Sequence, residues 1–291
     1  MRTTDPQSQV VPEYRLEGAV HFVLKRMETL EPDRPEDEPP HRHSYYTIIW
    51  VEEGTGTHTI DFAHYLVQPG SIYFLTPEQV HLLHLETPPR GWVVEFNADF
   101  LAAQGIPLMY LTELQLFGHC DLVTPWKVAE EEMDSWRSLL NRMEREQQQR
   151  ASFWQDRIGS LLKGWLIDLY RYRQERVGEM EVPQGAAGRL VREFKGLVEH
   201  HYREWHKVAN YADALAVTPG HLSETVKAET HLPAKHIIQD RLLLEARRMA
   251  RFTEYSVKET AHALGFDDPS HFAKVFKKVV GHSYLDFRHE S

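Results

Sequence analysis

The chain has a single cysteine and no long apolar run. Cys120 is the only cysteine among the 291 residues, so no disulfide can form within the chain. A membrane-spanning helix needs about 18 or more consecutive apolar residues, and no stretch approaches that length. Residues 1–9 are polar and unlike a signal peptide. These absences predict a cytoplasmic protein without a membrane partner.

The sequence also lacks the patterns on which most enzyme assignments depend. It shows no specific pair of nucleophile and base and no specific pair of catalytic carboxylates. It has no glycine-rich loop of the kind that cradles phosphates. We therefore expect no catalytic residues and no cofactor, which leaves a binding function.

Acidic residues outnumber basic ones, and the excess is unevenly distributed. The whole chain has a formal net charge of −10. From Gly185 onward, 16 lysines and arginines stand against 14 acidic residues, a balance of +2, whereas the rest of the chain has 17 against 29, a balance of −12. This division fits the two domains expected for the chain length. The near-neutral C-terminal part predicts weak non-specific affinity for nucleic acid, because counterion release scales with the phosphates contacted.

One pattern between residues 208 and 288 occurs twice. Ala212 and Leu215 recur as the same residue types 49 residues later. Each copy predicts a short helix, a tight turn and a second helix that opens with a capping residue and a proline, Thr218-Pro219 in one copy and Asp268-Pro269 in the other. Two helix–turn–helix units joined by a long helix are the layout of a DNA reader.

The second copy carries the most specific motifs. They read VKETAHALGF at 257–266, HFAKVFKK at 271–278 and GHS at 281–283. These motifs closely resemble the signature of AraC-type transcriptional regulators. One departure is Tyr284, which stands where that family usually has proline. The resemblance implies that residues 189–291 form a double helix–turn–helix domain that binds double-stranded DNA.

The second helix of each copy is expected to present its N-terminal residues to base edges. Following the resemblance, base contacts are expected at Gly220, Ser223, Glu224, Ser270, His271, Ala273 and Lys274. Phosphate contacts are expected at Lys227, Arg241, Lys277 and Lys278. Lys274 can donate to guanine, and Glu224 can accept from cytosine N4. The alternative for each single residue is a solvent-exposed helix face that contacts no DNA.

Residues 10–125 favour short strands separated by turns. The run 45–51 is β-branched and aromatic, and a glycine-containing turn follows at 53–56. This pattern predicts a β-sandwich or barrel. It resembles the cupin-like sensor domains that precede the DNA reader in many AraC-type regulators, and the matching elements are Pro40-His41-Arg42-His43, Trp50-Val51-x-x-Gly54 and Pro77-Glu78-Gln79-Val80-His81.

Histidines recur at these matching elements. His41 and His43 should point to the same side of one strand. In metal-dependent cupins a His-x-His pair, a carboxylate and a later histidine hold an ion, but Thr47 stands where the carboxylate is expected, so no metal is predicted. A three-histidine metal site and purely structural histidines remain alternatives. An effector pocket is expected to be lined by His41, His43, Tyr45, His81 and His84.

Residues 126–177 predict two amphipathic helices. The apolar stripe of the first consists of Met133, Trp136, Leu140 and Met143. The stripe of the second consists of Ile158, Leu161, Trp165 and Leu169. These stripes either pack on the barrel and on each other or include a homodimer seam, which the resemblance favours and which we expect for the second stripe. Residues 178–188, rich in glycine, are expected to be a linker.

The predicted fold class is therefore α+β and multidomain. A cupin-like β-barrel (10–125) and a helical dimerisation segment (126–177) precede the linker (178–188) and an all-α double helix–turn–helix (189–291). The predicted function is a sequence-specific transcriptional regulator that acts as a homodimer and responds to an unknown small-molecule effector, with RNA polymerase as a candidate partner. One alternative is an N-terminal domain that only dimerises. Another is a metal-dependent cupin enzyme fused to a DNA-binding domain, which the missing carboxylate disfavours.

Overall fold

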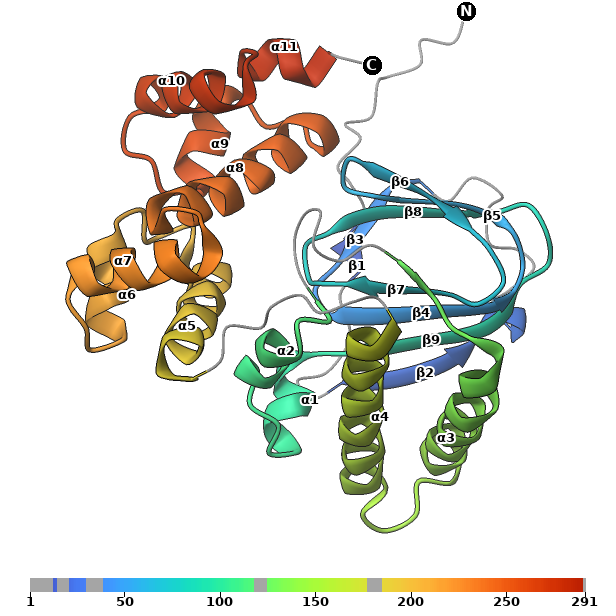
Figure 1. Cartoon of the computed structure of the whole chain (residues 1–291). Helices are drawn as coiled ribbons and strands as arrows, with labels where there is room; N and C mark the ends of the chain where they lie inside the picture. Colours follow the sequence, from blue (N-terminus) through green and yellow to red (C-terminus); the bar gives the residue numbers. More distant parts are fainter. Residues whose placement is uncertain (1–12, 15–20, 30–38, 118–124, 177–184, 290–291) are drawn as a thin grey trace, which may run out of the picture. The chain divides into compact units, whose positions relative to one another are not determined.

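The chain forms two compact units, Pro12–Met180 and Glu181–Ser291 (Figure 1). The computed structural model describes residues 13–14, 21–29, 39–117, 125–176 and 185–289. Each unit has its own cluster of buried apolar residues. Across the described ranges, no helix is long and apolar enough to cross a membrane.

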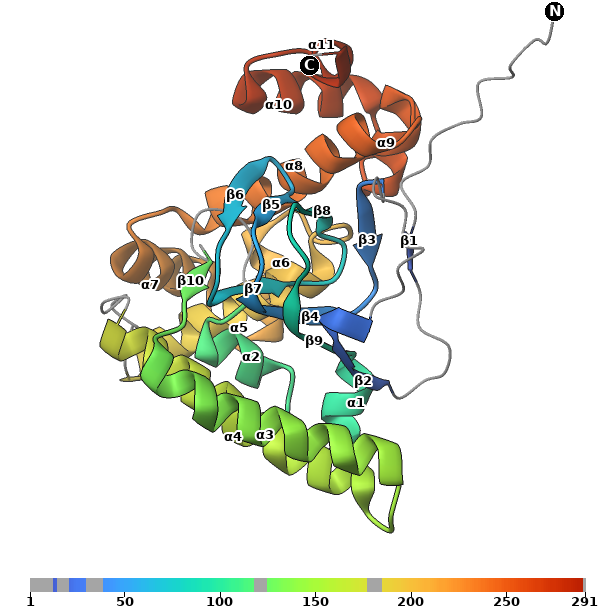
Figure 2. The same ribbon diagram turned by 90° about the vertical axis from the view of Figure 1, so that its right-hand side faces the viewer.

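Two five-stranded sheets face each other in the first unit (Figures 1 and 2). Their strands pair antiparallel apart from the parallel pair β1–β3. The first sheet has the order β1 (Glu13–Tyr14), β3 (His41–His43), β8 (Val80–Leu85), β5 (Gly56–Ile60) and β6 (Ala63–Val67). The second has the order β10 (Trp126–Lys127), β7 (Ser71–Leu75), β4 (Tyr46–Glu53), β9 (Arg90–Phe96) and β2 (Phe22–Arg26), and the short helix η1 (Met27–Thr29) follows β2.

The central strand β4 is buried on both faces. Ile49 and Val51 belong to the apolar cluster between the two sheets, together with Tyr73 of β7. Ile48 and Trp50 point to the opposite face and belong to the larger cluster of the unit. Successive residues of a strand point to opposite faces, so a strand buried on both sides needs the continuous apolar run that the sequence shows here.

The outer face of the second sheet is covered by helices. Trp136 of α3 packs edge-on against Trp50 of β4 and Trp165 of α4, with ring centroids 5.9 and 6.4 Å apart. The predicted homodimer seam is wrong for Ile158, Trp165 and Leu169, because they are fully buried in the core of their own unit and only Leu161 is half-buried. The helices of this unit are α1 (Ala98–Ala103), α2 (Met109–Leu114), α3 (Glu130–Gln149) and α4 (Trp154–Arg176).

The secondary-structure elements of the second unit are all helices across its described residues. Its first described helix, α5, begins at Gly185, so residues 185–188 are the first turn of this helix and not part of the predicted linker, whose remaining residues, 178–184, lie outside the described ranges. One apolar cluster joins its elements. Its helices are α5 (Gly185–His201), α6 (Val208–Ala214), α7 (Pro219–Thr230), α8 (Ala234–Phe252), α9 (Val257–Ala263), α10 (Pro269–Val280) and α11 (Tyr284–His289).

The sequence repeat reappears as a repeated backbone turn. Ala216 donates its N–H to the Asp213 carbonyl at 3.1 Å, and 49 residues later Gly265 donates to the His262 carbonyl at 3.0 Å. Both turn residues are left-handed, with φ of 53° and 73°. At Gly265 a Cβ atom would collide with the carbonyl oxygen of Arg203. The second turn therefore requires glycine, whereas the first carries an alanine under backbone strain.

Substitutions at these two equivalent positions are expected to have opposite effects. Ala216→Gly should stabilise the second unit by ~0.5–1 kcal/mol, because glycine adopts the left-handed conformation without a steric penalty. Gly265→Ala should destabilise it by more than about 1 kcal/mol, because strain and a collision add together. Calorimetric unfolding of the full chain measures both. A loss of stability in Ala216→Gly would show that the turn of the first copy is unstrained.

Candidate functional site

Helix α7, the second helix of the first helix–turn–helix, is capped as its sequence predicts. Thr218 Oγ1 accepts a hydrogen bond from the backbone N–H of His221 at 3.2 Å, and Pro219 occupies the first turn. Leu222 and Val226 are fully buried in the core of the unit. Three of its predicted DNA-contacting residues are exposed, namely Gly220, Glu224 and Lys227.

Helix α10 repeats this arrangement in the second copy. Asp268 accepts hydrogen bonds from the backbone N–H groups of Ser270 at 2.9 Å and His271 at 3.2 Å. The first of these bonds is the main cause that lowers the pKa of the Asp268 carboxyl. Phe272 and Phe276 are fully buried. The predicted DNA-contacting residues that α10 exposes are Ser270, His271, Lys274, Lys277 and Lys278.

Two of the predicted base contacts are less accessible than the rest. Ser223 is half-buried, and its hydroxyl donates to the carbonyl of Pro219 at 2.7 Å. Its oxygen atom can still accept a hydrogen bond. Ala273 is half-buried beside Phe272 and can offer only its methyl group.

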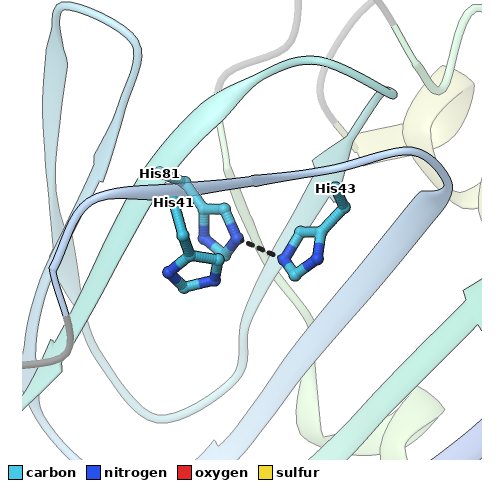
Figure 3. Close-up of side chains that lie close together, drawn as sticks. All are labelled: His41, His43 and His81. Atoms are coloured by element: carbon cyan, nitrogen blue, oxygen red, sulfur yellow. Dashed lines mark hydrogen bonds between the residues drawn. The ribbon is translucent and has the colours of Figure 1, made fainter. Parts of the chain in front are cut away.

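Three histidines of the first unit lie together on β3 and β8 (Figure 3). His41 and His81 are paired across the two strands. His43 Nε2 lies 2.8 Å from His81 Nε2. One ring nitrogen from each of the three lies within 4.8 Å of the others. His41 and His81 are buried, and His43 is half-buried.

Aromatic and imidazole rings surround this histidine cluster. His58 of β5 is fully buried, and its Nε2 lies 3.1 Å from His81 Nδ1. Burial, followed by the charge of nearby His41, lowers the pKa of His58 to about 3, which keeps its ring neutral at neutral pH. The rings of Tyr14 and Tyr45 lie 5.0 Å from His41 and 4.5 Å from His43.

No carboxylate joins the cluster among the described residues. Thr47 is buried on β4, directly opposite Glu95 of β9. The Glu95 carboxylate accepts two hydrogen bonds from Lys25 Nζ, each of 3.0 Å, so its charge is balanced by that ammonium group. The cluster therefore offers imidazole nitrogens and, within the described ranges, no carboxylate oxygen.

Two protein families match the two units in the order in which they occur. Residues 27–161 match the family described as AraC-like ligand binding domain, and residues 211–290 match a family described as helix-turn-helix domain. The chain belongs to the AraC-type transcriptional regulators. It is a DNA-binding regulator with a ligand-binding N-terminal domain.

Curated AraC-type relatives extend over almost the whole chain. The HTH-type transcriptional activator RhaS of Pectobacterium atrosepticum is 26% identical over 283 residues, which are 93% of this chain and 95% of the relative. RhaS of Escherichia coli strain SMS-3-5 is 27% identical over 266 residues, 89% and 91% of the two chains. Among solved structures, ToxT from Vibrio cholerae is 13% identical, covers 93% of this chain and 98% of its own, and reaches a TM-score of 0.41, too low to support a conclusion.

His84 does not lie with the other predicted pocket residues of this AraC-type regulator. It is exposed and pairs with Thr57 in the β5–β8 ladder. His84 is three residues from His81 on the same strand, and an odd separation turns two side chains to opposite faces of a sheet. The prediction for His84 is therefore wrong, whereas His41, His43, Tyr45 and His81 lie side by side.

The prediction that Arg241 contacts a phosphate is also wrong. Its side chain is only 6% exposed, and its Nε donates to Glu199 at 2.7 Å. Its guanidinium lies 3.9 Å from the ring centroid of Tyr202 and 3.5 Å from Glu245. Although burial opposes its charge, the surrounding acidic groups raise the pKa of Arg241. This arginine holds α5 against α8 and is not presented to a phosphate.

Sequence reasoning missed His58 and Tyr14. His58 lies in an alternating stretch, so its inward orientation follows from the sequence, but its proximity to His81 depends on the pairing of β5 with β8. Tyr14 lies beside the cluster because β1 pairs in parallel with β3, and no local sequence motif predicts this pairing.

Arg241→Met is expected to act on stability and not on DNA contacts. Removing one partner of a buried ion pair costs on the order of 3 kcal/mol, because the remaining charge stays buried. The loss should appear as a lower unfolding temperature of the second unit. Among the molecules that remain folded, the dependence of DNA affinity on salt should stay unchanged. A flatter salt dependence in Arg241→Met would instead return this residue to the phosphate contacts.

Proposed function

We propose that α7 and α10 each enter the major groove of double-stranded DNA and read bases with their first turns. The observation that carries this proposal is the repeated geometry of the two helices. In both, a capped first turn is exposed, while apolar side chains such as Leu222 and Phe272 anchor the helix in the core. A recognition helix needs this combination of fixed position and exposed N-terminal residues.

The exposed residues divide into two roles. Near the start of the helices, Gly220, Ser223 and Glu224 of α7 and Ser270, His271, Ala273 and Lys274 of α10 would meet base edges. Further along, Lys227 of α7 and Lys277 and Lys278 of α10 would bind phosphates. Phosphate contacts fix the register of the protein on the duplex, whereas base contacts select the sequence.

A ligand in the first unit would control how the two reading helices are presented. The pocket we propose is lined by His41, His43, Tyr45 and His81. A ligand shifts such an equilibrium only as far as its affinities for the two states differ. The relatives are named transcriptional activators, and we propose that this protein also activates transcription. Its proposed partner is RNA polymerase, and its proposed location is the cytoplasm.

We also propose a homodimer, whose interface must avoid the buried stripe of α4. Leu161 is the half-buried member of that stripe. Phe153, 80% exposed, immediately precedes α4 and lines the same shallow hollow as Leu161. Leu161→Glu should leave the unit folded and yield a monomer in sedimentation velocity, with Lys163→Glu on the exposed side of α4 as the control. A folded, dimeric Leu161→Glu protein would place the interface elsewhere.

The two lysine roles predict different phenotypes in α10. Lys274→Ala should relax base preference, since a good base contact contributes ~1–3 kcal/mol of discrimination. Lys277→Ala should weaken binding to all sequences and flatten the plot of log affinity against log salt by about one unit. Selection of bound duplexes from random DNA by the full chain, followed by salt titration, measures both.

Lys163→Ala is the matched control, because it removes one exposed positive charge from the first unit. It should change neither base preference nor salt dependence. Unaltered base preference in Lys274→Ala would remove this residue from the reading set. Equal binding of all duplexes by the unmodified chain would contradict sequence-specific reading altogether.

A further inference from the structure

We propose that His41, His43 and His81 bind one divalent transition-metal ion, each through one ring nitrogen. These nitrogen atoms come from two neighbouring strands and lie within 4.8 Å of one another (Figure 3). The three side chains are held by the β3–β8 pairing, so their clustering is part of the sheet register. This inference is independent of the proposed reading of DNA by α7 and α10.

The distances in the cluster suit a common ion. A metal–nitrogen bond of about 2.0–2.1 Å places two nitrogens bound to the same ion about 3.0–3.4 Å apart. His43 Nε2 and His81 Nε2 are 2.8 Å apart, already close to that range. The third nitrogen lies within 4.8 Å, so a modest rotation of the His41 side chain completes a three-nitrogen site.

In His41 and His81, the Nδ1 atom is already hydrogen-bonded, as the second ring nitrogen of a metal-bound histidine commonly is. His41 Nδ1 lies 3.2 Å from the carbonyl oxygen of Pro39, which can only accept a hydrogen bond. Nδ1 therefore carries the proton, and Nε2 keeps its lone pair. His81 Nδ1 lies 3.1 Å from His58 Nε2. When His81 donates its Nδ1 proton to His58, its Nε2 has a lone pair that can bind the ion. Such outer hydrogen bonds orient histidine ligands and strengthen metal binding.

The contact between His43 and His81 also predicts the proton balance. Without an ion, two Nε2 atoms 2.8 Å apart need one proton between them to form a hydrogen bond. An ion that takes both Nε2 lone pairs requires this proton to move to the Nδ1 atom of the same ring. Metal binding by neutral imidazoles is thus expected to change their tautomers without releasing a proton.

The ligand set selects the class of ion. Imidazole suits Zn²⁺, Ni²⁺, Co²⁺ and Cu²⁺, whereas Mg²⁺ and Ca²⁺ prefer oxygen ligands, and no carboxylate joins the cluster among the described residues. Three protein ligands leave at least one coordination position open. That position can hold water or a donor atom of the effector.

The test is metal titration of the full-length, untagged chain after dialysis against a chelator. Co²⁺ binding is followed by visible absorption and Zn²⁺ binding by calorimetry in two buffers of different ionisation enthalpy, which also measures whether protons are released. We expect one ion per chain, with no comparable binding of Mg²⁺. His43→Ala and His81→Gln should each weaken binding by more than about 100-fold, since even outer-shell changes cost 10–100-fold.

Matched variants separate this site from the other histidines of the chain. His84→Ala removes an exposed histidine from the same strand as His81 and should leave metal affinity unchanged. His58→Gln should weaken binding by about 10–100-fold through the orientation of His81. Circular dichroism confirms that each variant is folded, and His43, being half-buried, is the safest substitution.

Two results would overturn the metal site. One is a wild-type affinity no higher than that of folded His43→Ala. The other is an equal loss in His84→Ala, which would mean binding by scattered surface histidines. Neither result bears on DNA selection, so the metal site and the DNA-reading proposal can fail separately.

Discussion

Burial of β4 on both faces is the constraint on which the first unit depends. One face of this strand contributes Ile49 and Val51 to the space between the sheets, and the other contributes Trp50 to the core under α3 and α4. Each core needs the strand in the same register, so a shift by one residue would disrupt both at once. The same core also buries the apolar face of α4. In the proposed homodimer, a partner subunit would contact this helix only at residues that the core leaves uncovered, such as Leu161.

Local features of the sequence correctly predicted how α7 and α10 begin in the second unit. Capping residues, a proline in the first helical turn and apolar spacing all act within a few residues, and they reappear in the structure at α7 and α10. The departure at Tyr284 could not be interpreted locally. Its ring packs on Phe272 and Phe276, and its hydroxyl lies 2.6 Å from Thr260 Oγ1, so the tyrosine ties α11 to α9 and α10 where the family usually has proline.

Predictions that required knowledge of distant pairing were less secure. The i, i+2 spacing correctly predicted a shared orientation for His41 and His43. The strand pairing then places His84 outside the histidine cluster and His58 beside His81. Neither position can be predicted without the order of strands in the sheet. Arg241 failed for the same reason, because its main partner Glu199 lies 42 residues earlier in the chain. A basic residue on a predicted helix reveals its charge but not the acid that neutralises it.

The near-neutral charge of the second unit conceals an asymmetry between the two helices proposed to read DNA. Helix α10 carries three lysines and no acidic residue, whereas α7 carries one lysine and two glutamates. Asp268, the nearest acid to α10, caps the helix through backbone hydrogen bonds, where the helix dipole favours its charge. Each phosphate neutralised contributes about 0.9 to the salt slope, so, of the two helices proposed to read DNA, α10 would contribute more of the electrostatic attraction. Helix α7 would gain little from charge, and its contribution to the proposed binding would come from shape and from specific hydrogen bonds.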